Sequence, residues 1–383
     1  MHRKLRMGQV GGSLDAFIGA VHRRAAIFDH EIELVAGCFS QSPEKSKATG
    51  ESLYLDSNRI YDSFEQMIRQ EKERPDGDRI DFVSICTPNY LHFAPAKMAL
   101  ENGFHVICDK PMTLNIQEAK DLAEIVKKTG LVFGLTHNYT GYPMVKQARD
   151  MVKNGKLGTI RKIVVEYPQG WLSLDEENKD YKQAIWRTDP ARSGAAGAMG
   201  DIGTHAENLA EYITGLHISE LCADLTAFVP GRQLDDDGNV LLRFEGGAKG
   251  VLQVSQVANG EENSLKIFVY GETGGLEWHQ MEPNTLYHKT QTSQQLIRPN
   301  VGEMSASAKA HIRLPAGHPE GFFEAFANVY RNFAYAVRAH MAGKPADPLY
   351  DFPGVQDGVR GLAFIDTVLA SDKSEMKWTK FIS

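Results

Sequence analysis

Three side chains capable of acid–base chemistry occur in short, unusual contexts. Lys110 lies between an acid and a proline in Cys108-Asp109-Lys110-Pro111, and Asp201 and His205 are four residues apart in Gly197-Ala-Met-Gly-Asp-Ile-Gly-Thr-His205. A histidine exchanges a proton near neutral pH, a carboxylate can orient it, and an ammonium stabilises charge that develops on a substrate oxygen. Each also has a structural alternative: a surface turn for the lysine, a helix N-cap for the aspartate and a hydrogen-bonded core position for the histidine.

A glycine-rich stretch near the N-terminus predicts a phosphate-binding loop. Residues 8–22 follow a short expected strand and open an expected helix, which is where a dinucleotide's pyrophosphate meets free N–H groups and a positive helix dipole. Gly11 fits the first glycine of the dinucleotide fingerprint, Ser13 stands where the second would be, and Gly19 comes late. The alternative is an ordinary glycine-rich turn. The predicted cofactor contacts from this stretch are Gly11, Gly12, Ser13, Phe17 and Ile18.

The end of the second expected strand bears on the choice between NAD and NADP. The segment Gly37-Cys38-Phe39-Ser40-Gln41-Ser42 has no acid to bind the adenosine ribose, and Lys45 and Lys47 follow. A hydroxyl and an ammonium without a repelling carboxylate suit a 2′-phosphate. We therefore predict that Ser40 and Lys45 bind the cofactor, with NADP slightly favoured over NAD. The alternative is that Ser40 caps the next helix and the lysines face solvent.

Two turns follow expected parallel strands, and ligands bind at the carboxyl ends of such strands. They supply the remaining predicted cofactor contacts: Thr87, Pro88, Asn89, His92, Asp109 and Lys110. Polar and aromatic residues suited to a polyhydroxylated ring could line the pocket, with core or interface positions as their alternative. The predicted substrate contacts are Asn138, Tyr139, Trp186, Arg187 and His318, and further candidates are His137, Trp171 and Tyr181.

The elements that must position these residues change in character along the chain. Up to residue 137, continuous apolar runs alternate with helical patterns, which predicts a doubly wound parallel sheet. The expected strands are 32–39, 81–86, 105–108 and 131–135, and the expected helices are 17–29, 91–102 and 116–129. The middle of the chain has closely spaced strand patterns, which predict a mostly antiparallel sheet: 159–167, 219–229, 239–245, 249–257, 264–270, 274–279 and 284–290. Residues 319–342 and 354–371 are expected helices.

Composition narrows the class of protein. The chain has 383 residues and a net charge of −7, which argues against a nucleic-acid or anionic-membrane surface. Four widely spaced cysteines favour a reducing compartment, and the absence of a signal-peptide pattern or long apolar run makes a cytoplasmic protein the expectation. Asp235-Asp236-Asp237 is predicted to lie in a hairpin turn rather than to bind a cation, and no metal site is expected.

Taken in order, the motifs resemble the Gfo/Idh/MocA oxidoreductases, which include glucose–fructose oxidoreductase and inositol dehydrogenases. The resemblance rests on Gly19-x-x-His22, Thr87-Pro88-Asn89, Asp109-Lys110-Pro111, Lys156-Leu-Gly-Thr-Ile160, Trp186-Arg187 and Asp201-Ile-Gly-Thr-His205. It covers nearly the whole chain. The sequence departs from the family in two places. It has Asp109 where the family's Glu-Lys-Pro motif has glutamate, and its phosphate loop is longer and lacks the middle glycine.

The resemblance implies an α/β protein with a Rossmann domain, residues 1–137, and a substrate-binding and oligomerisation domain built on a large open sheet, residues 138–383. It implies Lys110, Asp201 and His205 as the catalytic residues. The implied reaction is NAD(P)-dependent hydride transfer to or from a hydroxyl or carbonyl of a sugar, inositol or related polyol, in a homodimer or homotetramer. The alternative is a catalytically silent regulator of the same fold that senses dinucleotide.

Overall fold

The computed structural model describes residues 3–179 and 181–383, which form two compact units. The first unit comprises the chain up to Thr113, Gln117–Asn138 and Phe322–Gly358. The second comprises Leu114–Ile116, Tyr139–Gly321 and Val359–Ser383. Each unit is described by itself. The first unit contains Phe322–Gly358 as well as the N-terminal part of the chain, so no single position divides the chain into the two units. The domain boundary after residue 137 stays a prediction.

The first unit is built on a five-stranded parallel sheet, as the apolar runs predicted. The strands lie in the order β2-β1-β3-β4-β5, with bounds β1(Leu5–Gly11), β2(Ile32–Cys38), β3(Phe82–Cys86), β4(His105–Cys108) and β5(Phe133–Leu135). Met7, Phe82 and Val83 are fully buried, because helices cover both faces of a sheet wound in this way. The order places the carboxyl ends of β1, β3 and β4 next to one another, where the predicted loops begin.

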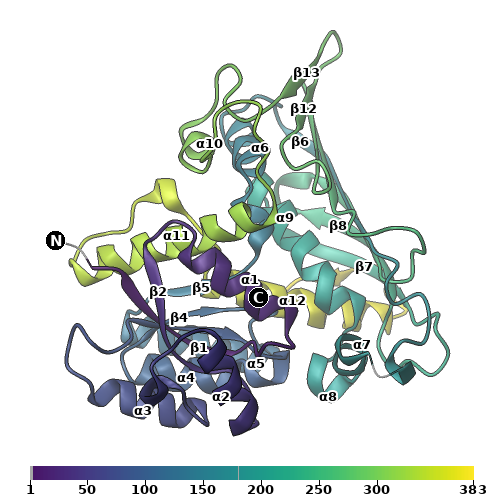
Figure 1. Ribbon diagram of the computed structural model, residues 1–383. Helices are drawn as coiled ribbons and strands as arrows, with labels where there is room; N and C mark the ends of the chain where they lie inside the picture. The colour runs from purple at the N-terminus through teal and green to yellow at the C-terminus, as the bar shows by residue number, and fades with distance from the viewer. Residues whose placement is uncertain (1–2, 180) are drawn as a thin grey trace. The chain divides into compact units, whose positions relative to one another are not determined.

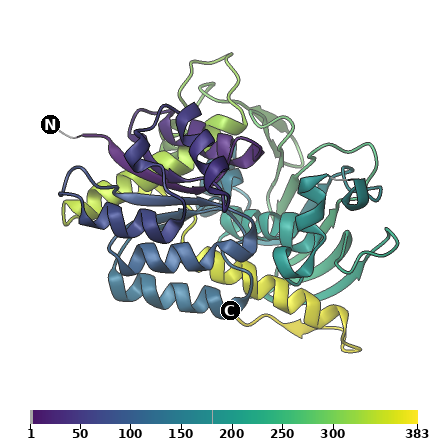
Figure 2. The same ribbon diagram turned by 60° about the horizontal axis from the view of Figure 1, so that its bottom comes forward.

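The helices of the first unit divide between the two faces of the sheet. Their bounds are α1(Phe17–Ile27), α2(Pro43–Ser52), α3(Phe64–Glu73), α4(Phe93–Glu101), α5(Ile116–Thr129) and α11(Phe322–Met341). Figure 2 shows α3, α4 and α5 running side by side along one side of the sheet. On the other side α11 lies beside α1 (Figure 1), and Phe326, Tyr330 and Phe333 join the same apolar core as Met7 and Val21. A helix from near the end of the chain thus completes the core of the first unit.

The second unit carries a nine-stranded sheet, in the order β13-β12-β11-β10-β6-β9-β8-β7-β14. Its strands are β6(Ile160–Pro168), β7(Ile218–Thr226), β8(Asp237–Phe244), β9(Lys249–Ser255), β10(Lys266–Gly271), β11(Gly275–His279), β12(Leu286–Lys289), β13(Gln294–Ile297) and β14(Thr379–Lys380). The pairing is antiparallel except between β6 and β9. This confirms a mostly antiparallel sheet, but β13 and β14 were not expected: β13 is largely exposed and polar, and β14 has two residues, so neither has an apolar pattern.

Two helices, α6(Pro143–Lys153) and α9(Thr204–Thr214), pack on one face of this sheet. The other α-helices of this part of the chain are α7(Lys182–Arg187), α8(Pro190–Ser193), α10(Ala306–Ala310) and α12(Val355–Asp372). On β6, Ile163 and Val165 are fully buried, whereas Val164 and Glu166 between them are only half-buried. One face of the sheet therefore belongs to the core, and the opposite face is open in the chain as described.

Two local expectations need correction or comment. Ser40 does not cap the helix that follows β2: the N-cap of α2 is Ser42, whose side chain accepts the Lys45 N–H, while the Ser40 hydroxyl accepts the Ser42 N–H. Among the described residues, no helix combines the length and the apolar character that crossing a bilayer requires.

Candidate active site

The loop after β1 has the geometry of a cradle for a phosphate. Gly11 and Gly12 have φ angles of 82° and 74°, which favour glycine. A Cβ on Gly19 would lie 2.3 Å from the Gly12 Cα, so the first turn of α1 touches the loop backbone directly. Gly12 and Gly19 thus allow the close packing of loop against helix that the dinucleotide fingerprint requires of one of its glycines, although the spacing along the sequence is longer.

A buried cation holds this loop in place. Arg23, on α1, is 8% exposed and donates from Nη1 to the Gly12 carbonyl oxygen at 2.6 Å. The N-cap residue of α1 is Ala16, which makes no side-chain cap hydrogen bond. The first N–H groups of α1 are thus not capped by their own N-cap side chain, and such groups bind anions. The glycine cradle and this helix terminus fit the pyrophosphate of NAD or NADP.

The side chains around the cradle differ in exposure. Phe17 is 71% exposed at the start of α1, whereas Ile18 packs against the apolar core of the first unit. The Lys45 ammonium lies 3.5 Å from an oxygen of the exposed Asp15 carboxylate. Lys45, which the sequence assigned to a 2′-phosphate, therefore already has an acidic neighbour from the phosphate loop.

The turn after β3 is joined to the segment after β4 by one buried histidine. His92 has zero exposure, and its ring nitrogens lie 2.8 Å from the Thr87 and Pro111 carbonyl oxygens. The Thr87 hydroxyl donates to the Leu91 carbonyl, which closes the turn that contains Pro88 and Asn89. His92 thus fastens two strand-end loops together; its predicted contact with a cofactor stays a prediction.

Lys110 follows an aspartate whose carboxylate is turned inward. One oxygen of Asp109 accepts the Lys110 backbone N–H at 2.9 Å and the Thr136 hydroxyl at 2.8 Å, and the other lies 3.7 Å from Nε2 of His22. Burial by itself raises the pKa of this carboxyl group, but His22, Lys110 and His92 together hold the pKa of Asp109 well below its usual range. Asp109 is therefore an anion whose carboxylate binds the backbone N–H of Lys110.

Asp201 and His205 lie on one continuous helical segment of the second unit. Met199–Gly203 forms a π-helical turn that leads directly into α9, rather than the first α-helical turn that the spacing predicted. π-turns inside helices are frequent at functional sites. Asp201 is not an N-cap: the two carboxylate oxygens of Asp235 accept the Gly197 and Met199 N–H groups, each at 2.7 Å. Asp235, and not Asp201, therefore caps the start of this segment.

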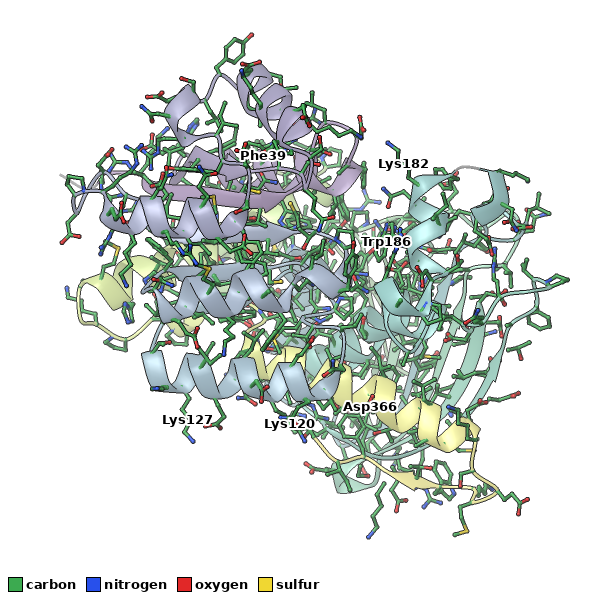
Figure 3. The ribbon with its side chains drawn as sticks, turned by 90° about the horizontal axis from the view of Figure 1, so that it is seen from below. Phe39, Lys120, Lys127, Lys182, Trp186 and Asp366 are labelled. Carbon is green, nitrogen blue, oxygen red and sulfur yellow. The ribbon has the colours of Figure 1, made fainter. Side chains whose placement is uncertain are left out.

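The Asp201 carboxylate is positioned by an amide and a guanidinium. The Gln256 side chain donates to it at 2.8 Å, and Nε of Arg187 lies 3.3 Å from the same oxygen. The Arg187 guanidinium stacks over the Trp186 ring at 4.2 Å and lies 5.8 Å from the Trp171 ring centroid. In Figure 3, Trp186 and Lys182 project from α7, the helix that ends at Arg187. The carboxylate thus adjoins a group of aromatic and polar side chains.

His205 is 7% exposed and packs against a tyrosine of the same unit. Its ring centroid lies 4.8 Å from that of Tyr139 in an edge-on arrangement. Tyr139 and Tyr167 share a short hydrogen bond, and Asn263 donates to the first and accepts from the second. Burial raises the pKa of both tyrosines, so their hydroxyls stay protonated and act as hydrogen-bonding groups. Among these residues His205 is left as the group suited to accept a proton near neutral pH.

The remaining predicted residues are less closely grouped. Lys110 belongs to the first unit and Asp201 and His205 to the second, so the prediction that they meet stays a prediction. Asn138 is buried in the first unit, and its Nδ2 has no hydrogen-bond partner among the residues described. His318 is exposed, and its Nδ1 lies 3.3 Å from the Pro315 carbonyl oxygen and 3.4 Å from the Ala316 carbonyl oxygen of its own loop.

Several functional groups escaped the sequence reasoning. Gln256 lies at the end of an expected strand, but glutamines at strand ends are common and nothing singled it out. Asn263 and Tyr167 were not predicted either, because their roles depend on which strands pair with β6. Asp235 was expected in a turn, and it does lie in the connection between the antiparallel strands β7 and β8. Its capping of the Asp201 segment had no sequence signal.

Comparison with known proteins places both halves of the chain. A family described as "Oxidoreductase family, NAD-binding Rossmann fold" matches residues 6–137, and the "GFO/IDH/MocA C-terminal domain" matches residues 145–277. An uncharacterized oxidoreductase of Bacillus subtilis, YfiI, is 33% identical over 99% of this chain and 97% of its own length.

Solved structures agree with these matches over the full length. An oxidoreductase from Sinorhizobium meliloti is 44% identical, with a TM-score of 0.90 over 99% of this chain and 100% of that chain. An inositol dehydrogenase homolog from Azotobacter vinelandii, solved with NAD+, is 34% identical, with a TM-score of 0.95 over 100% of this chain and 98% of that chain. The chain described here belongs to the Gfo/Idh/MocA oxidoreductases, whose N-terminal half is an NAD-binding Rossmann fold.

Proposed function

We propose that this protein is an NAD(P)-dependent dehydrogenase or reductase that acts on a CH–OH group of a cyclic polyol or a sugar. The observation that carries the proposal is the Asp201 cluster of the second unit: its carboxylate is held by Arg187 and Gln256, Trp186 and Trp171 adjoin Arg187, and the helical segment that carries Asp201 also carries His205. Further support comes from the Azotobacter vinelandii homolog, which has been solved with NADH and myo-inositol.

The proposed mechanism assigns one task to each catalytic side chain. The bound nicotinamide supplies the hydride acceptor or donor. In the oxidation direction, His205 accepts the proton of the substrate hydroxyl while the carbon loses its hydride and becomes a carbonyl. The Lys110 ammonium donates a hydrogen bond to the same oxygen, which stabilises its developing negative charge, and Asp201 orients the imidazole or the substrate. The proposal requires the two units to bring Lys110 and His205 to one substrate oxygen.

The proposed substrate class follows from the groups available. Flat aromatic faces such as those of Trp171 and Trp186 would pack against the apolar faces of a sugar ring, while Arg187 and the Asn138 Nδ2, which has no partner among the described residues, would supply donors to its hydroxyls. The predicted substrate contacts thus become Asn138, Tyr139, Trp186 and Arg187. His318 stays a weaker proposal because its loop is exposed.

For the cofactor we propose NAD or NADP. The prediction that NADP is slightly favoured rests on the missing acid after β2 and on Lys45; the Asp15 carboxylate 3.5 Å from Lys45 weakens that argument. Relatives have been solved with NAD+ and NADH. Titration of NADH and of NADPH, followed by nicotinamide fluorescence, tests the choice: tighter binding of NADPH would support the role of Ser40 and Lys45.

The central test replaces Lys110 and His205 by alanine. A positioned acid–base group and a positioned charge each contribute about 100-fold or more, so each variant should lose at least ~100-fold in turnover on a polyol and sugar panel while dinucleotide binding is kept. If both side chains act on one oxygen, the double variant should lose less than the product of the single losses. Near-normal turnover in both single variants contradicts the assignment. A wild-type protein that binds dinucleotide but oxidises and reduces nothing supports the alternative, a dinucleotide-sensing regulator.

We also propose that the open face of the second unit's sheet is covered by another copy of the chain, in a homodimer or homotetramer. Phe228, Leu241 and Tyr270 are 64%, 45% and 43% exposed, and a hollow of about 820 Å³ lined by Phe228, Glu166 and Gln253 lies on this face. Apolar faces of this kind are commonly closed by a second subunit. Light scattering should show an oligomer that Leu241→Arg dissociates; a monomeric wild-type protein would contradict the proposal. The cytoplasmic location stays a prediction.

A further inference from the structure

A buried chain of polar side chains crosses the core of the first unit and takes no part in the mechanism proposed above. The hydroxyl of Tyr330 on α11 lies 2.7 Å from the Ser84 hydroxyl on β3 and 2.7 Å from Nδ1 of His22 on α1. All three residues have zero exposure. The ring of His22 is also held edge-on against Phe326 at 4.9 Å. Tyr330 thus fixes both the position and the rotation of the imidazole.

The other end of this chain points at the residue before the catalytic lysine. Nε2 of His22 lies 3.7 Å from one oxygen of Asp109 and has no hydrogen-bond partner in the described part of the chain. The second Asp109 oxygen receives the Lys110 backbone N–H and the Thr136 hydroxyl. His22 therefore faces the one carboxylate oxygen that these two donors leave, at a distance at which a charge still interacts with an imidazole N–H.

A purely structural explanation accounts for only part of this arrangement. Buried polar groups need hydrogen-bond partners, and the Ser84 and Tyr330 hydroxyls supply such a partner to each other. That requirement does not explain why the chain continues to His22 and ends at Asp109, since an apolar residue at position 22 would pack against Phe326 as well. The continuation links α1, β3 and α11 to the peptide that carries Lys110.

We propose that His22, held by Tyr330, is a positioning residue: it fixes the orientation of the Asp109 carboxylate and, through the Lys110 backbone N–H, the peptide from which the Lys110 side chain extends. The proposal rests on the catalytic role of Lys110 proposed above. It assigns a role to His22, the residue of the Gly19-x-x-His22 motif that neither the cofactor cradle nor the substrate cluster uses. It also gives α11 a part in the site, although that helix lies more than two hundred residues further along the chain.

The same contacts influence the pH at which Asp109 takes up a proton. The titratable groups that act on Asp109 are His22 from α1, Tyr330 from α11, Cys86 from β3, Cys108 from β4, Lys110 beside it, and His92 and His137 from neighbouring loops. Burial raises the pKa of Asp109, and His22 is the first of the groups that oppose this effect. Loss of His22 should therefore let Asp109 take up a proton at higher pH than in the wild-type protein.

The test compares Tyr330→Phe and His22→Asn with Tyr335→Phe, a matched hydroxyl deletion on the same helix. Tyr335 packs edge-on against Tyr350 and lies outside the polar chain. Both test variants should lose about 10- to 100-fold in kcat, as displaced catalytic groups do, with KM and dinucleotide affinity within about twofold of the control.

A second readout does not need a substrate. Trace acetylation followed by mass spectrometry gives the reactivity of Lys110 relative to Lys120 and Lys127, which are exposed and point outward from α5 (Figure 3). In both test variants this ratio should change by about threefold or more, and in Tyr335→Phe it should not. An unchanged ratio together with turnover within about twofold of the control overturns the proposal. The proposal would also be overturned if turnover, dinucleotide affinity and melting temperature all fell together in the test variants, because that pattern indicates general destabilisation of the fold. If the wild-type protein turns over nothing, the catalytic proposal fails, and the labelling ratio alone decides the role of His22.

Discussion

Replacement of Gly19 by alanine tests the cofactor cradle most directly. The added Cβ would stand 2.3 Å from the Gly12 Cα, 2.6 Å from the Gly12 oxygen and 2.8 Å from the Gly12 carbonyl carbon. All three atoms are backbone, so no flexible side chain can move aside. Ordinary contact begins near 3.4 Å, and the loop and α1 must therefore separate by about 1 Å.

Two opposing effects act on stability. Alanine favours a helix over glycine by up to ~1 kcal/mol, while forcing a methyl group into a packed site costs about 1–3 kcal/mol. We expect the overlap to prevail, because the Arg23 hydrogen bond at 2.6 Å holds the Gly12 carbonyl and resists the displacement. The net loss should be about 1–2 kcal/mol, which lowers the melting temperature by a few degrees.

The effect on dinucleotide binding should be larger. A hydrogen bond to a charged group contributes about 1.5–3 kcal/mol, so loss of one loop N–H contact to the pyrophosphate weakens binding by roughly 10- to 100-fold. Fluorescence titration with NADH measures this change. The matched control is Gly361→Ala in the interior of α12, where the nearest atom to the new Cβ is 3.9 Å away and binding should not change. If Gly19→Ala binds NADH within about twofold of the wild-type protein, the loop does not hold the pyrophosphate as argued.

Two further predictions concern stability. Burial and the neighbouring His340 lower the pKa of His105 from 6.5 to about 4, and its Nδ1 accepts the Val132 N–H. As the pH falls, His105 binds a proton in the unfolded chain before it does so in the folded chain. The stability that the neutral His105 contributes is therefore complete above about pH 6.5 and is lost between about pH 6.5 and pH 4, a loss of roughly 3 kcal/mol. In urea unfolding, the stability of His105→Asn should depend less steeply on pH across this window. Asp235→Ala leaves the Gly197 and Met199 N–H groups without their carboxylate, which should cost about 1–3 kcal/mol and reduce turnover while NADH binding is kept. Calorimetry and NADH titration of the same sample check the second prediction, and unchanged turnover in Asp235→Ala would show that the cap does not position Asp201.

Local patterns predicted most of the strands and about half of the α-helices, and the helices that they missed are α2, α3, α6, α7, α8 and α10. The expected helix 116–129 matches α5, and the buried strands of the first unit agree with β2, β3 and β4 within one residue at either end. Continuous apolar runs and glycine stops are properties of neighbouring residues, which is why they can be read along the chain. The phosphate loop was harder, because its spacing departs from the usual fingerprint and only the contact between the Gly12 and Gly19 backbones shows which glycine approaches the helix.

The contacts that complete the candidate site join residues far apart in the chain. Gln256 and Arg187 meet at Asp201, Asp235 caps the segment that carries it, and Tyr330 reaches His22 across 308 positions. No local pattern encodes such pairs, because each depends on which strands become neighbours and on how helices pack over them.

The amino-acid sequence alone determined the kind of fold, the family resemblance and the chemical types of the candidate catalytic groups, since residue identity and short spacing carry that information. The tertiary structure decided which carboxylates bind backbone N–H groups and which remain available, and it showed that a late helix completes the nucleotide-binding unit. The physical reason is that hydrogen bonds and burial are satisfied between whole elements, and their partners are chosen only when the sheets form and the helices cover them.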